Sequence, residues 1–226
     1  MIQINGLNKS LHGGGHRVDI LNDINLTIPT GQFVAITGAS GSGKTTLLSL
    51  MAGLDAPTDG TILIDEQDIT KFNEDELAEL RGQRFGFIFQ NFHLIPTLTA
   101  LENVALAAEL NSANGSQKKS AELLDAVGLT DRFNHYPAQL SGGEQQRLCL
   151  ARAFVNEPDI VLADEPTGNL DSKNSKHILG LMIDLHQKKN ATVVLVTHES
   201  DVAEKTERTL VMGDGKIIED SMPTAP

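Results

Sequence analysis

The sequence predicts an α/β fold with a phosphate-binding core, an antiparallel β subdomain and an inserted helical subdomain. Residues 33–37 form an apolar run that leads directly into the glycine-rich loop 38–45, and a helical pattern follows. This order aims the backbone N–H groups of the loop and of the helix N-terminus at one point. Residues 91–157 show helical patterns, whereas 1–90 and 158–226 contain the strands of the core, so we expect one domain with 91–157 as its helical subdomain.

Apolar patterning predicts the elements of the first third of the chain. Strands are expected at 2–7, 18–28 and 33–37, as a pair within 58–69, and at 85–90, which ends in Gln90. Helices are expected at 45–54, after the glycine loop, and at 74–83, where Asn73 and Glu76 are spaced as a cap and its partner.

Helices dominate the middle of the chain, and strands return after it. Thr99 and Glu102 form a capping box that opens a helix over 99–110, and a helix over 116–128 ends on a glycine. The polar linker 111–119 between them reads as an exposed loop. Later strands and helices are expected at 160–164, 175–187, 192–198 and, as a hairpin around Asp214 and Gly215, at 209–219.

Composition excludes several classes of protein. The net charge of −12 over 226 residues argues against a nucleic-acid partner, because a polyanion needs clustered Lys and Arg. No apolar run reaches the ~20 residues of a membrane span, and the first residues lack a secretion signal, so we expect a soluble cytosolic chain. Cys149, the only cysteine, cannot form an internal disulfide and reads as a small buried helix residue.

The loop from Gly38 to Thr45 matches the phosphate-binding pattern G-x-x-x-x-G-K-T completely. Its glycines let backbone amides approach phosphate oxygens, Lys44 neutralises the outer phosphates, and the Thr45 hydroxyl holds Mg²⁺. A glycine-rich turn that serves only packing is the weaker alternative, because a strand and a helix flank the loop. The residues expected to bind nucleotide are Gly38, Ala39, Ser40, Gly41, Ser42, Gly43, Lys44, Thr45 and Thr46.

Two carboxylates stand at the end of the expected strand 160–164. Asp164 is placed to face a metal ion, and Glu165 to orient a water and take its proton. The alternative is a solvated turn before Pro166. We favour the site, because a buried apolar strand that runs into two acids is costly without a cation.

The stretch LSGGEQQR, residues 140–147, places a second glycine pair at the start of a helix. Ser141 and Glu144 form a capping box, so the helix over 142–154 presents free amides and the positive end of its dipole to an anion. On local physics alone, an ordinary capped helix explains the pattern equally well. The first loop already has its lysine, metal ligand and base, so a second phosphate site can serve the nucleotide of another copy.

These motifs carry a family resemblance. GASGSGKT, Gln90, LSGGEQQR, IVLADE, GNLD and His198 in VTHE occur in the order and spacing of the ATP-binding-cassette (ABC) ATPases, over essentially the whole chain. The resemblance implies an ABC-type nucleotide-binding domain with a RecA-like P-loop core, which hydrolyses ATP with Mg²⁺. It also implies a head-to-tail homodimer, in which each ATP lies between the loop of one subunit and the signature LSGGEQQR of the other.

The resemblance assigns roles to single positions. Gln90 would sense the γ-phosphate and contact the Mg²⁺ shell with Thr45 and Asp164, and His198 would hold the γ-phosphate. The implied catalytic residues are Lys44, Gln90, Glu165 and His198, and the residues implied to contact the opposing subunit's ATP are Ser141, Gly142, Gly143 and Asp171. Without the resemblance, a Gln or His at a strand end is an ordinary structural residue.

Within the family, residues 86–104 and 137–171 resemble the branch that serves lipoprotein release, macrolide export and related mechanical permeases. The nearest group is that of small ATPases paired with a large many-spanning permease. The implied partners are an integral membrane permease with a large extracytoplasmic domain and a second copy of this chain, without nucleic acid. The implied location is the cytoplasmic face of the bacterial inner membrane, which the chain reaches through its permease.

One stretch departs from the family pattern. Members usually stack the adenine on an aromatic residue shortly after the first strand, where this chain has Leu11 and His12. Either His12 or His16 takes that place, or the base is held loosely. A metal site made of these two histidines is a weaker alternative, because it has only two ligands.

The segment 91–104 after Gln90 is unusually apolar for a connection. Phe92, Leu94, Ile95 and Leu98 are hard to bury under one short helix, so we expect part of this segment to receive a permease helix. Packing inside the helical subdomain is the alternative.

Other functions use some of the same motifs. A lipoprotein-releasing ATPase is the first alternative. Soluble ABC ATPases that act on chromosomes need long coiled coils, and those that act on ribosomes need two cassettes in one chain; this sequence shows neither. A small-molecule kinase would use the same phosphate loop but has no need for LSGGEQQR.

Overall fold

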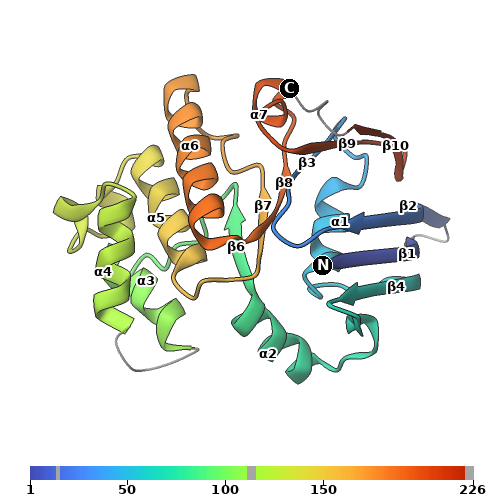
Figure 1. The fold of residues 1–226 in the computed structure, drawn as a ribbon, viewed down its shortest axis with the longest axis horizontal. Helices are drawn as coiled ribbons and strands as arrows, with labels where there is room; N and C mark the ends of the chain where they lie inside the picture. Colours follow the sequence, from blue (N-terminus) through green and yellow to red (C-terminus); the bar gives the residue numbers. More distant parts are fainter. Residues whose placement is uncertain (14–15, 111–115, 222–226) are drawn as a thin grey trace. The chain divides into compact units, whose positions relative to one another are not determined.

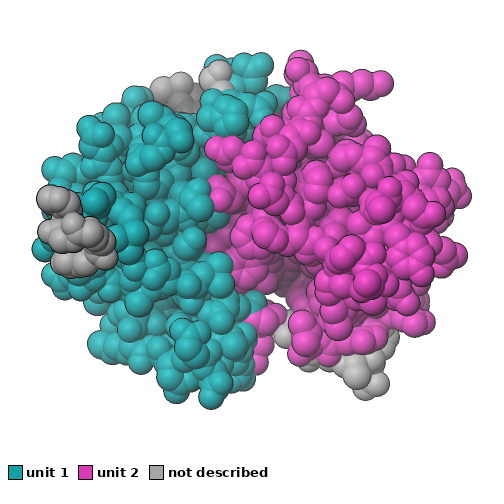
Figure 2. All heavy atoms as spheres, turned by 180° about the vertical axis from the view of Figure 1, so that it is seen from behind, with its two compact units in different colours: residues 1–81, 192–226 teal, residues 82–191 magenta. Residues whose placement is uncertain are grey.

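The computed structural model of the chain describes residues 1–13, 16–110 and 116–221. They fall into two compact units, residues 1–81 with 192–226 and residues 82–191 (Figure 2). Compactness alone defines these units, so the expected bounds of the helical subdomain, 91–157, stay a prediction. In the described part of the chain, no helix combines the length and the apolar character needed to cross a membrane.

One sheet of the first unit is antiparallel, with the strand order β2-β1-β4-β5 (Figure 1). Its strands are β1 (Ile2–Gly13), β2 (His16–Ile28), β4 (Asp59–Ile64) and β5 (Gln67–Asp68). Ile2 pairs with Ile28 on one side and Ile64 on the other, and all three are buried. The expected apolar alternation therefore marks the buried face of this sheet. β1 and β2 extend beyond their expected bounds because they pair along a long hairpin.

The remaining strands in the described part of the first unit are β3 and the strands beside it. They are β3 (Phe33–Gly38), β8 (Thr192–Val196), β9 (Arg208–Gly213) and β10 (Lys216–Ser221). β3 pairs in parallel with both β8 and β9, whereas β10 returns antiparallel to β9 through the expected hairpin. Every residue of β8 is buried, which explains its continuous apolar sequence.

Short helices connect these strands. They are α1 (Lys44–Met51), the 3-10 turn η1 (Ile69–Lys71), α2 (Glu74–Arg84), which leads into the second unit, and α7 (Ser200–Ala203). The structure confirms the helix after the glycine loop, but α1 ends at Met51 and not at Leu54. The cause is local, because Gly53 has a φ of 60° and cannot continue a helix.

In its described residues, the second unit combines a pair of parallel strands with four α-helices. Its elements are β6 (Phe85–Phe89), α3 (Ala100–Glu109), α4 (Ser116–Ala126), the 3-10 turns η2 (Thr130–Arg132) and η3 (Pro137–Gln139), α5 (Gly142–Phe154), β7 (Ile160–Asp164) and α6 (Ser172–Lys189). Helix α5 packs against β6, α3, α4 and α6, and its residues 148–151 are fully buried. Of the expected linker 111–119, residues 111–115 lie outside the described residues.

The helix starts confirm the expected caps. Thr99 and Ser141 each form a full capping box, with Glu102 and Glu144 respectively. The Asn73 side chain accepts hydrogen bonds from the amides of Asp75 and Glu76, both at 3.0 Å. These caps fix where α2, α3 and α5 begin, and α5 presents the signature at its first turn.

Candidate active site

The glycine-rich loop after β3 folds around the side chain of Lys44. Its Nζ donates hydrogen bonds of 2.9 Å to the carbonyl oxygens of Gly38 and of Ala39. The residue is only 7% exposed. A buried ammonium held by neutral carbonyl dipoles keeps its positive charge available to an anion in the loop.

Helix α1 begins inside this loop without a side-chain cap. Its N-cap is Gly43, with a φ of 99°, where a Cβ atom would lie 2.7 Å from the Leu21 side chain. The Ser42 hydroxyl is buried and has no hydrogen-bond partner within the described residues. An uncapped helix start and an unsatisfied hydroxyl fit a bound phosphate. Thr45, the second residue of α1, is exposed and carries the hydroxyl that is expected to bind the metal.

His198 lies in the same unit as the loop. β3 and β8 are parallel neighbours, with Ile36 opposite Val196, and the amide of Thr197 donates a hydrogen bond of 3.1 Å to the carbonyl of Ile36. The loop and His198 therefore leave the same carboxyl edge of the sheet, and His198 is exposed there. Ligands of parallel α/β sheets bind at this edge.

The second unit brings Gln90 and the two acids together. Phe89 at the end of β6 pairs with Asp164 at the end of β7, so Gln90 and Glu165 leave adjacent parallel strands. A Cβ on Gly168 would lie 3.0 Å from the Gln90 amide nitrogen and 3.4 Å from a Glu165 carboxylate oxygen. The two side chains thus converge on one glycine. The Asn169 side chain adds a hydrogen bond of 2.9 Å to the Gln90 carbonyl.

The signature glycines start α5 and lie against the turn before α6. A Cβ on Gly143 would lie 2.9 Å from the Asn174 side-chain oxygen, so a larger residue there would require the Asn174 side chain to move. Asp171 caps α6, and its carboxylate accepts a hydrogen bond of 2.7 Å from the Asn174 side chain. The hydrogen bond from the backbone amide of Asn174 is the main reason why the pKa of Asp171 lies below its usual value. The structure therefore groups Asp171 with the signature.

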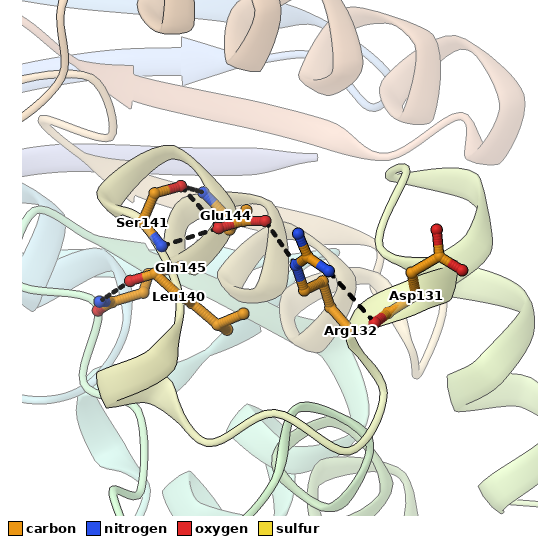
Figure 3. A network of polar contacts seen from close by, with 6 residues as sticks. All are labelled: Asp131, Arg132, Leu140, Ser141, Glu144 and Gln145. Atoms are coloured by element: carbon orange, nitrogen blue, oxygen red, sulfur yellow. Dashed lines mark hydrogen bonds and ion pairs between the residues drawn. The ribbon is translucent and has the colours of Figure 1, made fainter.

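Ser141 and Glu144 are tied together at the start of α5 (Figure 3). The amide and the hydroxyl of Ser141 each donate a hydrogen bond of 2.8 Å to Glu144 Oε2. Arg132 Nε, from the turn η2, donates a hydrogen bond of 2.8 Å to the other oxygen, Oε1. The Ser141 bonds first, and then Arg132, lower the pKa of Glu144 from 4.5 to about 2.

The connection after Gln90 is held by the signature helix. Phe92 and His93 both have a φ of 48°, an uncommon backbone conformation for side-chain residues. Arg152 of α5 holds them by donating hydrogen bonds of 2.8 Å to the Phe92 carbonyl and 2.5 Å to the His93 carbonyl. Farther along this segment, the side chain of Ile95 is exposed, at 39%. Phe92 and Leu94 are half-buried.

Sequence reasoning did not identify Arg132, Asn174 or Arg152. Asn174 follows the capping Asp171 by three residues, a spacing at which a helix-start partner is detectable. Arg132 lies twelve residues before Glu144 in an irregular segment, where no periodicity relates the two. The side chains of His12 and His16, considered for adenine or metal binding, lie outside the described residues.

Comparison with known proteins decides the family. A sequence model of the family described as ABC transporter matches residues 21–168, more than half of the chain. The chain belongs to the ABC transporter family. The expected ABC ATPase fold is confirmed by a solved structure of MJ0796, described as a dimeric bacterial ABC transporter cassette. It is 42% identical, with a TM-score of 0.92 over 100% of both chains. A second, post-hydrolysis structure of that cassette, bound to ADP and Pi, is 41% identical.

Relatives in the ABC transporter family match over nearly the whole chain. The uncharacterized ABC transporter ATP-binding protein YvrO of Bacillus subtilis is 46% identical, with 97% of this chain and 96% of the relative covered. The lipoprotein-releasing system ATP-binding protein LolD of Idiomarina loihiensis is 44% identical, with 95% of each covered. The macrolide export ATP-binding/permease protein MacB of Brucella abortus is 45% identical over 98% of this chain, but this chain spans only 34% of MacB. The chain is therefore an ABC-type ATPase.

Proposed function

We propose that this chain hydrolyses ATP in a head-to-tail homodimer and drives a separate membrane permease. The observation that carries the proposal is a pair of glycine-marked helix starts in one chain. α1 begins at the buried Lys44 behind its N-cap Gly43, and α5 begins at Gly142 behind its cap Ser141. The first has the lysine that a nucleotide needs, and the second has none. Two unlike phosphate sites fit one nucleotide shared by two copies.

The residues divide the chemistry between them. Lys44 and the loop 38–46 hold the phosphates, with Ser42 supplying a hydroxyl that lacks a partner within the described part of the chain. Glu165 takes a proton from the attacking water, and Gln90 and His198 contact the γ-phosphate. Ser141, Gly142, Gly143 and Asp171 face the nucleotide of the other copy.

Mg²⁺ fits this set of donors. The ion is usually bound by one or two carboxylates together with substrate phosphates and water, and not by a full protein cage. Thr45, Gln90 and Asp164 are the residues that would hold it, and it would neutralise charge on the β- and γ-phosphates. The described residues contain no cluster of three or more His, Cys, Asp or Glu side chains suited to a metal.

Two variants test the proposed chemistry. Lys44→Ala is expected to weaken ATP binding and to lower turnover, because it removes the ammonium that faces the phosphates. Glu165→Gln is expected to keep ATP affinity and to lose hydrolysis, because an amide does not accept the proton from water. Nucleotide titration and a phosphate-release assay separate them. Near wild-type hydrolysis by Glu165→Gln would exclude this residue as the base.

The partner in this proposal is an integral permease of the type with a large extracytoplasmic domain, which places the chain at the cytoplasmic face of the bacterial inner membrane. The similarity to MacB, named as an ATP-binding/permease protein, supports such a pairing. The segment after Gln90 supplies the contact surface, because Ile95 exposes an apolar side chain there. A lipoprotein-releasing complex is the second candidate, since the match to LolD covers 95% of that relative.

Co-purification tests the permease. Ile95→Glu is expected to abolish capture of a membrane permease from detergent extracts, while ATP hydrolysis by the isolated chain persists. Leu110→Glu is the matched control, because Leu110 is 80% exposed at the end of α3. The identity of the captured permease decides between export and lipoprotein release. Capture that survives Ile95→Glu would place the docking surface elsewhere.

A further inference from the structure

The hydroxyl of Ser141 is engaged within its own helix start. It donates its proton to Glu144 Oε2 at 2.8 Å and accepts from the Glu144 amide at 3.3 Å. A serine hydroxyl has only one proton to donate. To donate to a phosphate oxygen, Ser141 must therefore release Glu144.

Glu144 also brings a negative charge to a place proposed for an anion. Its carboxylate lies one helical turn inside the N-terminus of α5, and its pKa of about 2 keeps it ionised at physiological pH. An uncompensated carboxylate beside a triphosphate opposes binding, because like charges repel. The signature glutamate is therefore a cost to phosphate binding unless another group compensates it.

Arg132 is the group that compensates it. We propose that Arg132 is a positioning residue for the signature, which neutralises Glu144 and keeps its carboxylate bonded when the Ser141 hydroxyl turns to the partner's nucleotide. This rests on the proposed function, since it needs the signature to contact ATP. The Arg132 bond goes to Oε1 and the Ser141 bonds go to Oε2, so the first persists when the Ser141 hydroxyl leaves (Figure 3).

The backbone around Arg132 is fixed to α3. The Arg132 carbonyl accepts a hydrogen bond of 3.0 Å from the His135 amide. The carbonyls of Phe133 and His135 accept hydrogen bonds of 3.0 Å and 2.8 Å from the first two amides of α3, those of Leu101 and Ala100. The guanidinium is partly exposed, but it extends from an anchored segment, which limits the entropy lost when it pairs with Glu144.

The test measures ATP-dependent dimerisation in a hydrolysis-deficient background. Glu165→Gln is the reference, and Arg132→Gln, Arg132→Lys, Glu144→Gln and the Arg132→Gln/Glu144→Gln pair are added to it. Arg132→Gln is expected to weaken the contact between the signature and each shared nucleotide by roughly fivefold. The ATP concentration at which dimerisation is half-maximal is therefore expected to rise. ATP affinity of the monomer, which depends on the loop after β3, is expected to stay unchanged. Arg132→Lys is expected to recover most of the loss, because it keeps the charge.

The double variant separates this role from a structural one. Glutamine at position 144 keeps the capping geometry without the charge, so Arg132→Gln is expected to have little further effect beside it. Higher salt is expected to reduce the difference in half-maximal ATP concentration between Arg132→Gln and the reference. Equal dimerisation of Arg132→Gln and the reference overturns the inference, and so does a full Arg132→Gln loss in the double variant. A reference that fails to dimerise overturns the proposed function itself.

Discussion

Leu11 and Val18 face each other across the β1–β2 hairpin and expose 53% and 59% of their surface. They lie in the region where the resemblance to ABC ATPases implies an aromatic residue against adenine. Aliphatic side chains cover a base without the stacking that an aromatic ring provides. We therefore predict that recognition of the base is weak and that the phosphates supply most of the binding energy.

The chain is therefore expected to discriminate poorly between ATP and GTP. We expect kcat/KM values for the two nucleotides within about tenfold of each other, because the phosphates, which ATP and GTP share, carry most of the binding energy. Parallel hydrolysis assays with both nucleotides give the ratio. A strong preference for ATP would mean that another residue reads the base.

Cys149 is a structural residue in this account. It is fully buried in α5, its thiol donates a hydrogen bond of 3.2 Å to the Phe92 carbonyl, and burial raises its pKa to about 12. Only the thiolate is a nucleophile. The native chain is expected to resist a thiol reagent at neutral pH and to react fully once unfolded. Rapid labelling of the folded chain would contradict this.

The loop, strand-end acids and signature were predictable from sequence because each is a short contiguous motif on a recognisable element. Arg132 and Arg152 were not, because each contacts a segment distant in the chain. Arg152 reaches the Phe92 carbonyl from a position 60 residues later. The left-handed backbone of Phe92 and His93 also had no signal, since neither is glycine.

At the scale of elements, α3 and α5 begin behind the predicted caps, but α6 begins at Ser172 and not at the expected residue 175, and helix ends were predicted less well. Caps such as Thr99 and Ser141 carry a side-chain signature within three residues. The end of α1 depends on the backbone of Gly53, and the length of β1 depends on its pairing with β2. The short helix α7 (Ser200–Ala203) has too few residues for a periodic pattern.

The capping box of α5 makes a prediction about acid stability. The folded-state pKa of Glu144 is lowered from 4.5 to about 2, so its ionised form stabilises the fold above the unfolded pKa. The contribution disappears as pH falls through the folded value. Wild type is expected to exceed Glu144→Gln in free energy of unfolding at neutral pH, and the gap is expected to narrow from about pH 5 downwards. Denaturant titrations of both proteins measure it, and a gap that widens in acid would contradict the capping role.

At the scale of the molecule, the candidate residues are distributed over both compact units. The first holds the loop 38–46 and His198, and the second holds Gln90, Asp164, Glu165 and the signature. In the proposed dimer only the signature reaches across to the other copy, and the related MJ0796, 42% identical to this chain, is described as a dimeric cassette. The proposed function requires that the signature of one copy contacts the nucleotide held by the loop of the other.

Size-exclusion chromatography with light scattering tests this claim, with Glu165→Gln and Glu165→Gln/Ser141→Arg each saturated with ATP and Mg²⁺. We expect a stable dimer for the single variant, because ATP is bound but not hydrolysed. We expect a monomer for the double variant with unchanged ATP affinity, because arginine at 141 blocks only the opposing site. A Glu165→Gln chain that stays monomeric, or a Ser141→Arg chain that still dimerises, would contradict it.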